Sequence, residues 1–214
     1  MILAKLTVGP FAENTYVIGA PPRVAIVDPG AESERIVERV EREGWRPEAI
    51  LLTHGHLDHV AHAAHVAERY GIGLRIHRED LPYLEHPQMP DFAEMIGYRP
   101  PPEPEGYLED GQTLEVAGLT LEVLHCPGHT PGHVVLIHEE SRSILVGDVV
   151  FQRGVGRTDL PGGDTATLAH SIQERLFKLD GDYTLHPGHG PDTTLDEERR
   201  ENPFFGERAT VRWR

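Results

Sequence analysis

The sequence LLTHGHLDHV, residues 51–60, places three histidines and one aspartate within six positions, directly after an apolar run. Such side chains are costly to bury without a partner, so their position indicates either solvent or a bound ligand. In an extended segment, residues two apart point to the same side, so His54 and His56 can hold one ion together. A helix that begins here would project Asp58 and His59 from its first turn, toward a second ion. The spacing HxHxDH therefore predicts a metal site.

Composition limits the possible classes of protein. The chain has 214 residues, of which 38% are hydrophobic, as expected for a single globular domain spanning residues 1–214. It has no apolar run of about 18 residues and no signal-peptide core at its N-terminus, so we expect a cytoplasmic protein without a membrane partner. The single cysteine, Cys126, excludes a CxxC zinc site and leaves histidine and carboxylate as metal ligands. The net charge of −15 argues against a nucleic-acid partner.

Hydrophobic patterning alternates between short β-rich runs and helical ones. Two β-rich halves, each with its own helices, predict an α+β protein in which two sheets pack face to face with helices outside. The proline-rich segment 86–106 is predicted to be a loop or small lid. Strands are predicted at 14–19, 23–28, 49–54, 74–77, 113–116, 119–125, 133–139, 143–148 and 183–188, and helices at 33–44, 58–71 and 165–180.

Three further polar residues follow predicted strands. His129 lies in HCPGHTPGH, Asp148 in ILVGDVV, and His189 in LHPGHG. An unpaired carboxylate or imidazole at the end of an apolar strand is unfavourable unless it shares a ligand with its neighbours. These residues are therefore candidates to complete the site that begins at residue 54.

The order of these motifs resembles the metallo-β-lactamase superfamily, from residue 7 to residue 205. The resemblance implies an αββα sandwich of two mixed sheets, with two divalent metal ions at one edge. Zinc is the expected metal, with iron or manganese as alternatives. Asp148 would bridge the ions, and Asp58 and Asp148 would be the catalytic residues. The resemblance implies that the first ion is held by His54, His56 and His129, and the second by Asp58, His59 and His189.

Within this superfamily, GDVVFQRGVGRTDLPGGD and PGHGPDTT are most similar to the short bacterial members of the glyoxalase II (hydroxyacylglutathione hydrolase) branch. This similarity implies hydrolysis of a small anionic hydroxyacyl thioester by a metal-bound hydroxide. It also implies that Arg157 binds the substrate, with a solvated surface arginine as the alternative. Longer members bind glutathione through a C-terminal extension, whereas only 214 − 189 = 25 residues follow His189. The thiol carrier is therefore left open.

Two alternative functions fit the same motifs. The iron-dependent persulfide dioxygenases share the GRTD loop and several of the histidines. A protein of another class, a non-catalytic metal-binding or redox-sensing protein, could also hold metal. The open glycine-rich loop favours an enzyme, because structural metal sites are closed by protein ligands. The sequence leaves the metal, the acyl group and the oligomeric state undetermined.

Three other residues have expected supporting roles. Asp28, in VDPG, resembles a superfamily position that braces the site loops, with a turn-stabilising role as the alternative. His133 is expected either to orient the His129 loop or to lie at the surface. Cys126 is expected to be a small buried residue, with a reactive thiol as the alternative.

Overall fold

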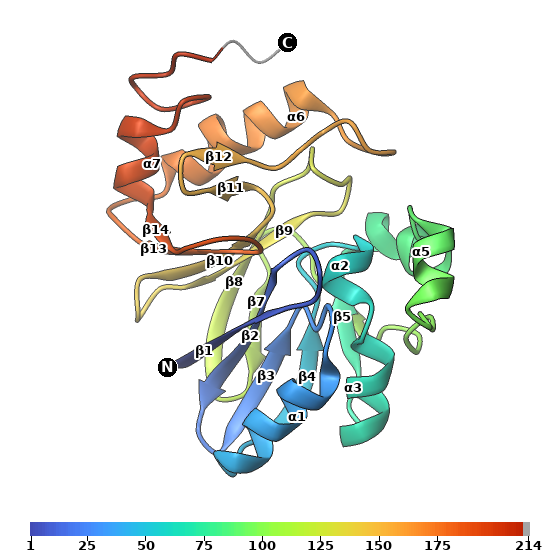
Figure 1. Cartoon of the computed structure of the whole chain (residues 1–214). Coiled ribbons are helices and arrows are strands. Elements are labelled where there is room, and N and C mark those ends of the chain that lie inside the picture. The colour runs from blue at the N-terminus through green and yellow to red at the C-terminus, as the bar shows by residue number, and fades with distance from the viewer. Residues whose placement is uncertain (212–214) are drawn as a thin grey trace.

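The computed structural model describes residues 1–211, and its first sheet has six strands of mixed direction (Figure 1). The pairs β1–β2 and β2–β3 are antiparallel, whereas β3–β4, β4–β5 and β5–β6 are parallel. The carboxyl ends of β3, β4 and β5 therefore lie at the same edge. In spatial order the strands are β1 (Ile2–Val8), β2 (Glu13–Ala20), β3 (Arg23–Val27), β4 (Arg46–Leu51), β5 (Leu74–Ile76) and β6 (Gly106–Tyr107).

The second sheet also has six strands and is also mixed. Its neighbours pair antiparallel except β10 and β13, which are parallel. A small separate hairpin, β11 (Val150–Phe151) and β12 (Gly154–Val155), follows β10. In spatial order the sheet is β14 (Thr193–Thr194), β13 (Thr184–Pro187), β10 (Ser143–Gly147), β9 (Val134–His138), β8 (Leu119–His125) and β7 (Thr113–Val116).

Three apolar clusters hold the layers together. The middle cluster joins the inner faces of both sheets, with Ile18 and Leu51 from the first and Leu121 and Leu136 from the second. Another packs α1 (Ser33–Arg42) and α3 (Ala63–Tyr70) on the outer face of the first sheet. The third packs α6 (Thr165–His170) and α7 (Leu195–Glu201) on the outer face of the second. The predicted αββα sandwich is confirmed.

Several elements differ from the sequence prediction. Strand β1 was not predicted, and neither was α7. Segment 86–106, predicted to be a loop or small lid, contains α5 (Pro90–Met95) and the start of β6. The predicted helix 165–180 is α6 followed by a π-helical turn, η2 (Ser171–Arg175), and a 3-10 turn, η3 (Leu176–Lys178).

The predicted helix 58–71 is two helices, α2 (Leu57–Val60) and α3. The break coincides with a tertiary contact, because the backbone N–H of His62 donates to the carbonyl of Pro29, 3.0 Å away, rather than to a carbonyl within its own helix. Helix α2 is therefore a single turn held against the loop after β3.

Two short helical elements complete the described chain, η1 (Arg78–Asp80) and α4 (Leu81–Glu85). None of the helices in residues 1–211 is long and apolar enough to cross a membrane.

Candidate metal centre

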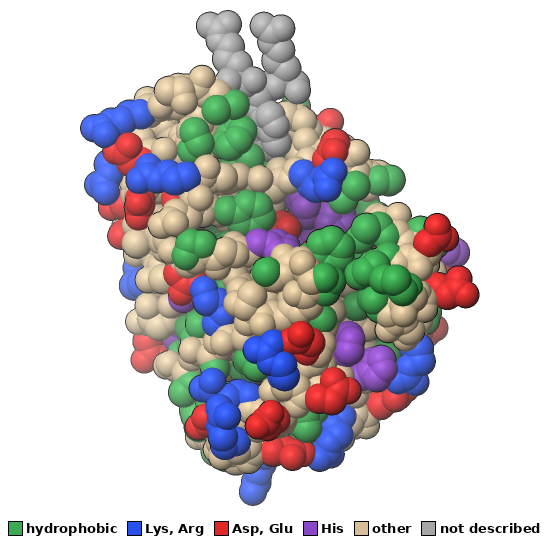
Figure 2. Space-filling view, in the orientation of Figure 1, with side chains coloured by type: hydrophobic (Ala, Val, Ile, Leu, Met, Phe, Trp, Pro, Cys, Tyr) green, Lys and Arg blue, Asp and Glu red, His purple; other side chains and the backbone are tan. Residues whose placement is uncertain are grey.

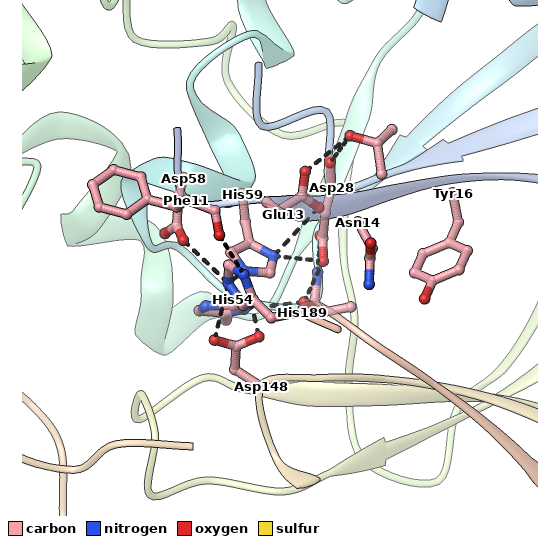
Figure 3. A network of polar contacts seen from close by, with 12 residues as sticks. Phe11, Glu13, Asn14, Tyr16, Asp28, His54, Asp58, His59, Asp148 and His189 are labelled. Atoms are coloured by element: carbon pink, nitrogen blue, oxygen red, sulfur yellow. Dashed lines mark hydrogen bonds and ion pairs between the residues drawn. The ribbon is translucent and has the colours of Figure 1, made fainter. Parts of the chain in front are cut away.

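The predicted ligands lie on loops at one edge of the two sheets. His54 and His56 follow β4, and Asp58 and His59 lie in the single turn α2. The remaining candidates come from the second sheet, after β8, β10 and β13 respectively: His129, Asp148 and His189. Figure 3 shows His54, Asp58, His59, Asp148 and His189 pointing toward one another from these separate segments.

The side chains form two groups of potential ligand atoms. In each group one ligand atom from every residue lies within 4.8 Å of the others, and the groups are His54, His56 and His129, and Asp58, His59 and His189. A third group, Asp28, His54 and His59, overlaps both. Asp148 lies between them. Its Oδ2 is 3.5 Å from His129 Nε2 in the first group, and its Oδ1 is 3.4 Å from His59 Nε2 in the second. All seven predicted residues therefore meet.

Hydrogen bonds outside the centre orient three of the imidazoles. His129 Nδ1 donates to the carbonyl of Arg157 at 2.7 Å, and His189 Nδ1 donates to the carbonyl of Phe11 at 3.0 Å. His59 Nδ1 donates to Asp28 Oδ2 at 3.0 Å. A neutral imidazole that donates from Nδ1 keeps its lone pair on Nε2, which is the atom facing the centre. These partners orient each ring with Nε2 toward the centre. His129 is neutral there, whereas His59 and His189 must each lose a proton before Nε2 can bind a metal.

Buried atoms without partners test whether metal ions fit. Among residues 1–211, Nε2 of His54, His56 and His129 and Oδ1 of Asp148 are buried without a hydrogen-bond partner. Leaving such groups unpaired is costly, and cations at the centre would satisfy them. Three imidazoles and a carboxylate whose free lone pairs converge fit the ligand chemistry of divalent transition metals.

Asp28 braces the first motif, as the resemblance implies. Its side chain is buried and accepts from the backbone N–H of Thr53 at 2.7 Å and from the Thr53 hydroxyl at 2.6 Å. Thr53 Oγ1 in turn lies 3.0 Å from His54 Nδ1. Because Asp28 also accepts from His59, one carboxylate fixes both ends of HxHxDH.

His133 is buried, so the surface alternative for this residue is wrong. Its ring stacks on His54 at a centroid distance of 4.7 Å, and its Nε2 accepts from the backbone N–H of Asp148 at 2.9 Å. His133 therefore holds the Asp148 backbone directly. Cys126 is fully buried, and burial raises its pKa to about 12, which does not fit a reactive thiol.

Asp80 supports the centre and was missed by sequence reasoning. It is fully buried at the end of η1 and accepts from the backbone N–H groups of Gly55, at 2.8 Å, and Gly132, at 2.6 Å, and from the hydroxyl of Thr130 at 2.7 Å. Burial raises its pKa to about 6. The sequence offered one signal for Asp80, a carboxylate shortly after a short strand. The surrounding residues HRED are so highly charged, however, that they are typical of a surface segment.

The two groups differ electrostatically in the metal-free chain. Burial lowers the pKa of His54 well below its usual range, lowers that of His56 to about 3, and lowers that of His129. For His59 and His189, burial has the same effect but is outweighed, because Asp148 and Asp58 raise the pKa of both. The first group is therefore neutral, whereas the second group retains protons.

The centre opens into a cleft of about 400 Å³ whose walls include Phe11, Met89, Phe151 and Arg157. Figure 2 shows histidine side chains near the surface beside a patch of hydrophobic ones. The guanidinium of Arg157 is exposed and makes two hydrogen bonds of 2.7 Å to Asp159. Arg157 therefore lines the cleft, but its charge is already paired.

An αββα sandwich with converging histidines and aspartates at its sheet edge defines a metallo-hydrolase class of protein. The model of the metallo-beta-lactamase superfamily matches residues 8–189, and the chain belongs to that superfamily.

The similarity to individual relatives covers nearly the whole chain. The hydroxyacylglutathione hydrolase GloC of Haemophilus influenzae is 37% identical, over 98% of this chain and 100% of that protein. Among solved structures, TTHA1623 in a di-iron-bound form is 39% identical with a TM-score of 0.86, over 94% of this chain and 100% of that one. The B3 metallo-beta-lactamase BLEG-1 is 33% identical with a TM-score of 0.86, over 94% and 98%. The predicted likeness to the glyoxalase II branch is confirmed.

Proposed function

We propose that this metallo-hydrolase cleaves hydroxyacyl thioesters, as the name of its relative from Haemophilus influenzae describes for that protein. The observation that carries the proposal is the pair of ligand groups on either side of Asp148, opening into the cleft. We further propose that residues 1–214 form one domain and that the substrate is a small anionic molecule.

We propose that each of the two ligand groups holds one divalent ion. Two such ions, when bound, supply Lewis acidity toward a thioester carbonyl and lower the pKa of water. The similarity to TTHA1623, whose solved structure is a di-iron-bound form, makes iron a candidate beside zinc. The proposed ligands are His54, His56 and His129 for one ion, Asp58, His59 and His189 for the other, and Asp148 for both.

The carboxylates have roles that follow from their surroundings. Asp58 lines the cleft and its Oδ2 lies 3.2 Å from His189 Nε2. Burial raises the pKa of Asp58, but the hydrogen bond from His189 and the nearby His59 lower it more, so the net pKa is lowered. Asp58 is therefore ionised and can orient water at the mouth of the centre. Asp148, more deeply buried, positions both halves of the centre.

The cleft favours a thioester with one anionic and one apolar part. Arg157 is the only arginine or lysine among the described residues that line it, and Phe11, Met89 and Phe151 supply apolar surface. A substrate carboxylate would have to share Arg157 with Asp159, or displace Asp159 from it. A second cavity of about 550 Å³ shares Phe11, Leu57 and Asp58 with the cleft and could receive a longer substrate arm.

The test is hydrolysis of a hydroxyacyl-glutathione thioester by the protein as purified, after metal removal, and after restoration with zinc or iron. We expect turnover that is lost with the metal and returns with it. Oxygen uptake with a glutathione persulfide would instead support the dioxygenase alternative. A chromogenic cephalosporin is included because BLEG-1 is a B3 metallo-beta-lactamase. Metal binding without turnover of any of these substrates would contradict the proposal and support a non-catalytic role.

A further inference from the structure

A second cluster of metal-ligating side chains lies outside the centre. His77 follows β5 of the first sheet, Glu79 lies in η1, and His125 is the last residue of β8 in the second sheet. One ligand atom from each residue lies within 4.8 Å of the other two, the same closeness as in the two groups of the centre. The two sheet ends are thus joined here by side chains that can bind a cation.

His125 is oriented like a metal ligand. Its Nε2 donates to the carbonyl of Pro131 at 2.8 Å, which leaves the lone pair on Nδ1. Its backbone is fixed on both sides, because its N–H donates to Asp110 and its carbonyl accepts from Arg175. A ligating histidine in proteins characteristically donates its other ring N–H to a carbonyl or carboxylate, as His125 does.

His77 and Glu79 are free to adjust. The His77 ring stacks on His125 at a centroid distance of 4.2 Å and an interplanar angle of 13°. Parallel rings cannot direct both lone pairs at one ion, so the His77 ring must turn. Turning gives up the stacking contact with His125 and a long hydrogen bond, 3.3 Å from the Glu79 backbone N–H to His77 Nδ1. Glu79 is exposed, so its carboxylate can approach an ion with little change in burial.

We propose that His77, Glu79 and His125 bind one additional divalent transition metal ion, with Zn²⁺ as the probe. Two imidazoles and one carboxylate are a common zinc ligand set, and water can fill the fourth position. The ion would connect the ends of β5 and β8. Through Pro131 it would also contact the loop that carries His129.

The chain contains a matched control pair. His62 and His65 also stack, at a centroid distance of 5.0 Å and an interplanar angle of 30°. Within residues 1–211 they belong to no group of three potential ligands. His62 Nδ1 is already occupied by the backbone N–H and the hydroxyl of Ser33. His65→Gln therefore removes a stacked, half-buried histidine without removing the proposed site.

The test uses the full chain with its metal content first measured as purified, then titrated with Zn²⁺ by calorimetry. We expect one further saturable equivalent per chain in the wild type and in His65→Gln. His77→Asn and Glu79→Gln should bind this equivalent at least about tenfold more weakly, because each loses one of only three protein ligands. Asparagine at position 77 can still accept the Glu79 N–H, so the start of η1 is preserved.

Thermal unfolding supplies a second measurement on the same four proteins. Zn²⁺ should raise the melting temperature of the wild type and His65→Gln, by binding the folded chain, and should raise that of the two site variants less. The proposal is overturned if His77→Asn and Glu79→Gln bind the additional equivalent as tightly as the wild type. It is also overturned if the wild type takes up no zinc beyond its initial content.

Discussion

At the scale of single residues, the centre depends on groups that face it and on groups that hold them. Asp148 is the residue whose oxygens reach both histidine groups, at 3.4 Å from His59 Nε2 and 3.5 Å from His129 Nε2. Burial raises the pKa of Asp148, but His59 and other neighbouring histidines lower it more, so the carboxylate is ionised. A buried carboxylate in this position is stable only with cationic partners.

Replacing Asp148 by alanine should remove this shared contact. We expect Asp148→Ala to bind less metal and to lose thioester hydrolysis by about 100-fold or more, because both ions lose a ligand. Cys126→Ala should retain most of the turnover, since Cys126 is buried apart from the centre. Metal analysis and steady-state kinetics on both variants check this prediction. The reverse pattern, with only Cys126→Ala inactive, would indicate thiol chemistry.

Arg157 should contribute to substrate affinity more than to the chemical step. Its exposed guanidinium is paired with Asp159, so its contact with a substrate carboxylate is weakened by competition and by solvent. Arg157→Ala should raise KM by roughly fivefold or less with a smaller change in kcat, and Asp159→Asn should lower KM for the same substrate. Kinetics with one acyl group on two thiols measures this. An unchanged KM in both variants would exclude Arg157 from binding.

At the scale of secondary-structure elements, strand ends and tight turns bring the residues together. The spacing HxHxDH was enough to predict which side chains of one segment share a direction, and polar residues after apolar strands marked the other ligand candidates. The supporting residue Asp80 could not be predicted this way. Asp80 contacts loops 25 and 50 residues away, and a single sequence carries no signal for such pairings.

Tertiary hydrogen bonds also explain why some elements were predicted wrongly. The division of helix 58–71 depends on a hydrogen bond between His62 and Pro29, which joins two segments that periodicity treats separately. Strand β1 was missed although buried and exposed residues alternate over its second half, where the apolar and polar residues of the sequence alternate as in a half-buried strand. Two-sheet architecture was predictable because it follows from the number and order of apolar runs rather than from their boundaries.

The turn after β13 provides a test at this scale. A Cβ at Gly188 would lie 2.3 Å from Asp148 Oδ1 and 2.5 Å from His59 Cε1, whereas a Cβ at Gly154 would meet only ordinary contacts with Phe151. Gly188→Ala should therefore displace these side chains and lose metal, while far-UV circular dichroism stays unchanged. Gly154→Ala should keep its metal. If Gly188→Ala kept the metal content of the wild type, the close packing of this turn against Asp148 and His59 would not be needed for metal binding.

At the scale of the whole molecule, the two sheets together build a centre whose two ligand groups differ in charge. Without metal, His54, His56 and His129 have lowered pKa values, whereas His59 and His189 have raised ones. Metal must displace protons from the second group but not from the first. The two ions should consequently respond differently to acid.

Acidification should release the ions in two steps. As pH falls through the raised pKa values of His59 and His189, protons compete for these side chains and the second group should lose its ion. The first group remains neutral to lower pH and should retain its ion longer. Elemental analysis after dialysis at stepped pH values checks this order. Simultaneous loss of both ions in one sharp step would contradict the separation into two groups.

The central claim, a two-ion centre that hydrolyses thioesters, is tested most directly by titrating metal-free protein with Zn²⁺ while following hydrolysis of a hydroxyacyl-glutathione thioester. The same titration is run on Glu79→Gln, in which the proposed additional site is weakened, so that the first equivalents taken up report on the centre. Turnover should rise with added metal and reach its maximum at two equivalents per chain, because Asp148 joins two separate ligand groups. Full activity at one equivalent, or hydrolysis by the metal-free chain, would contradict the claim.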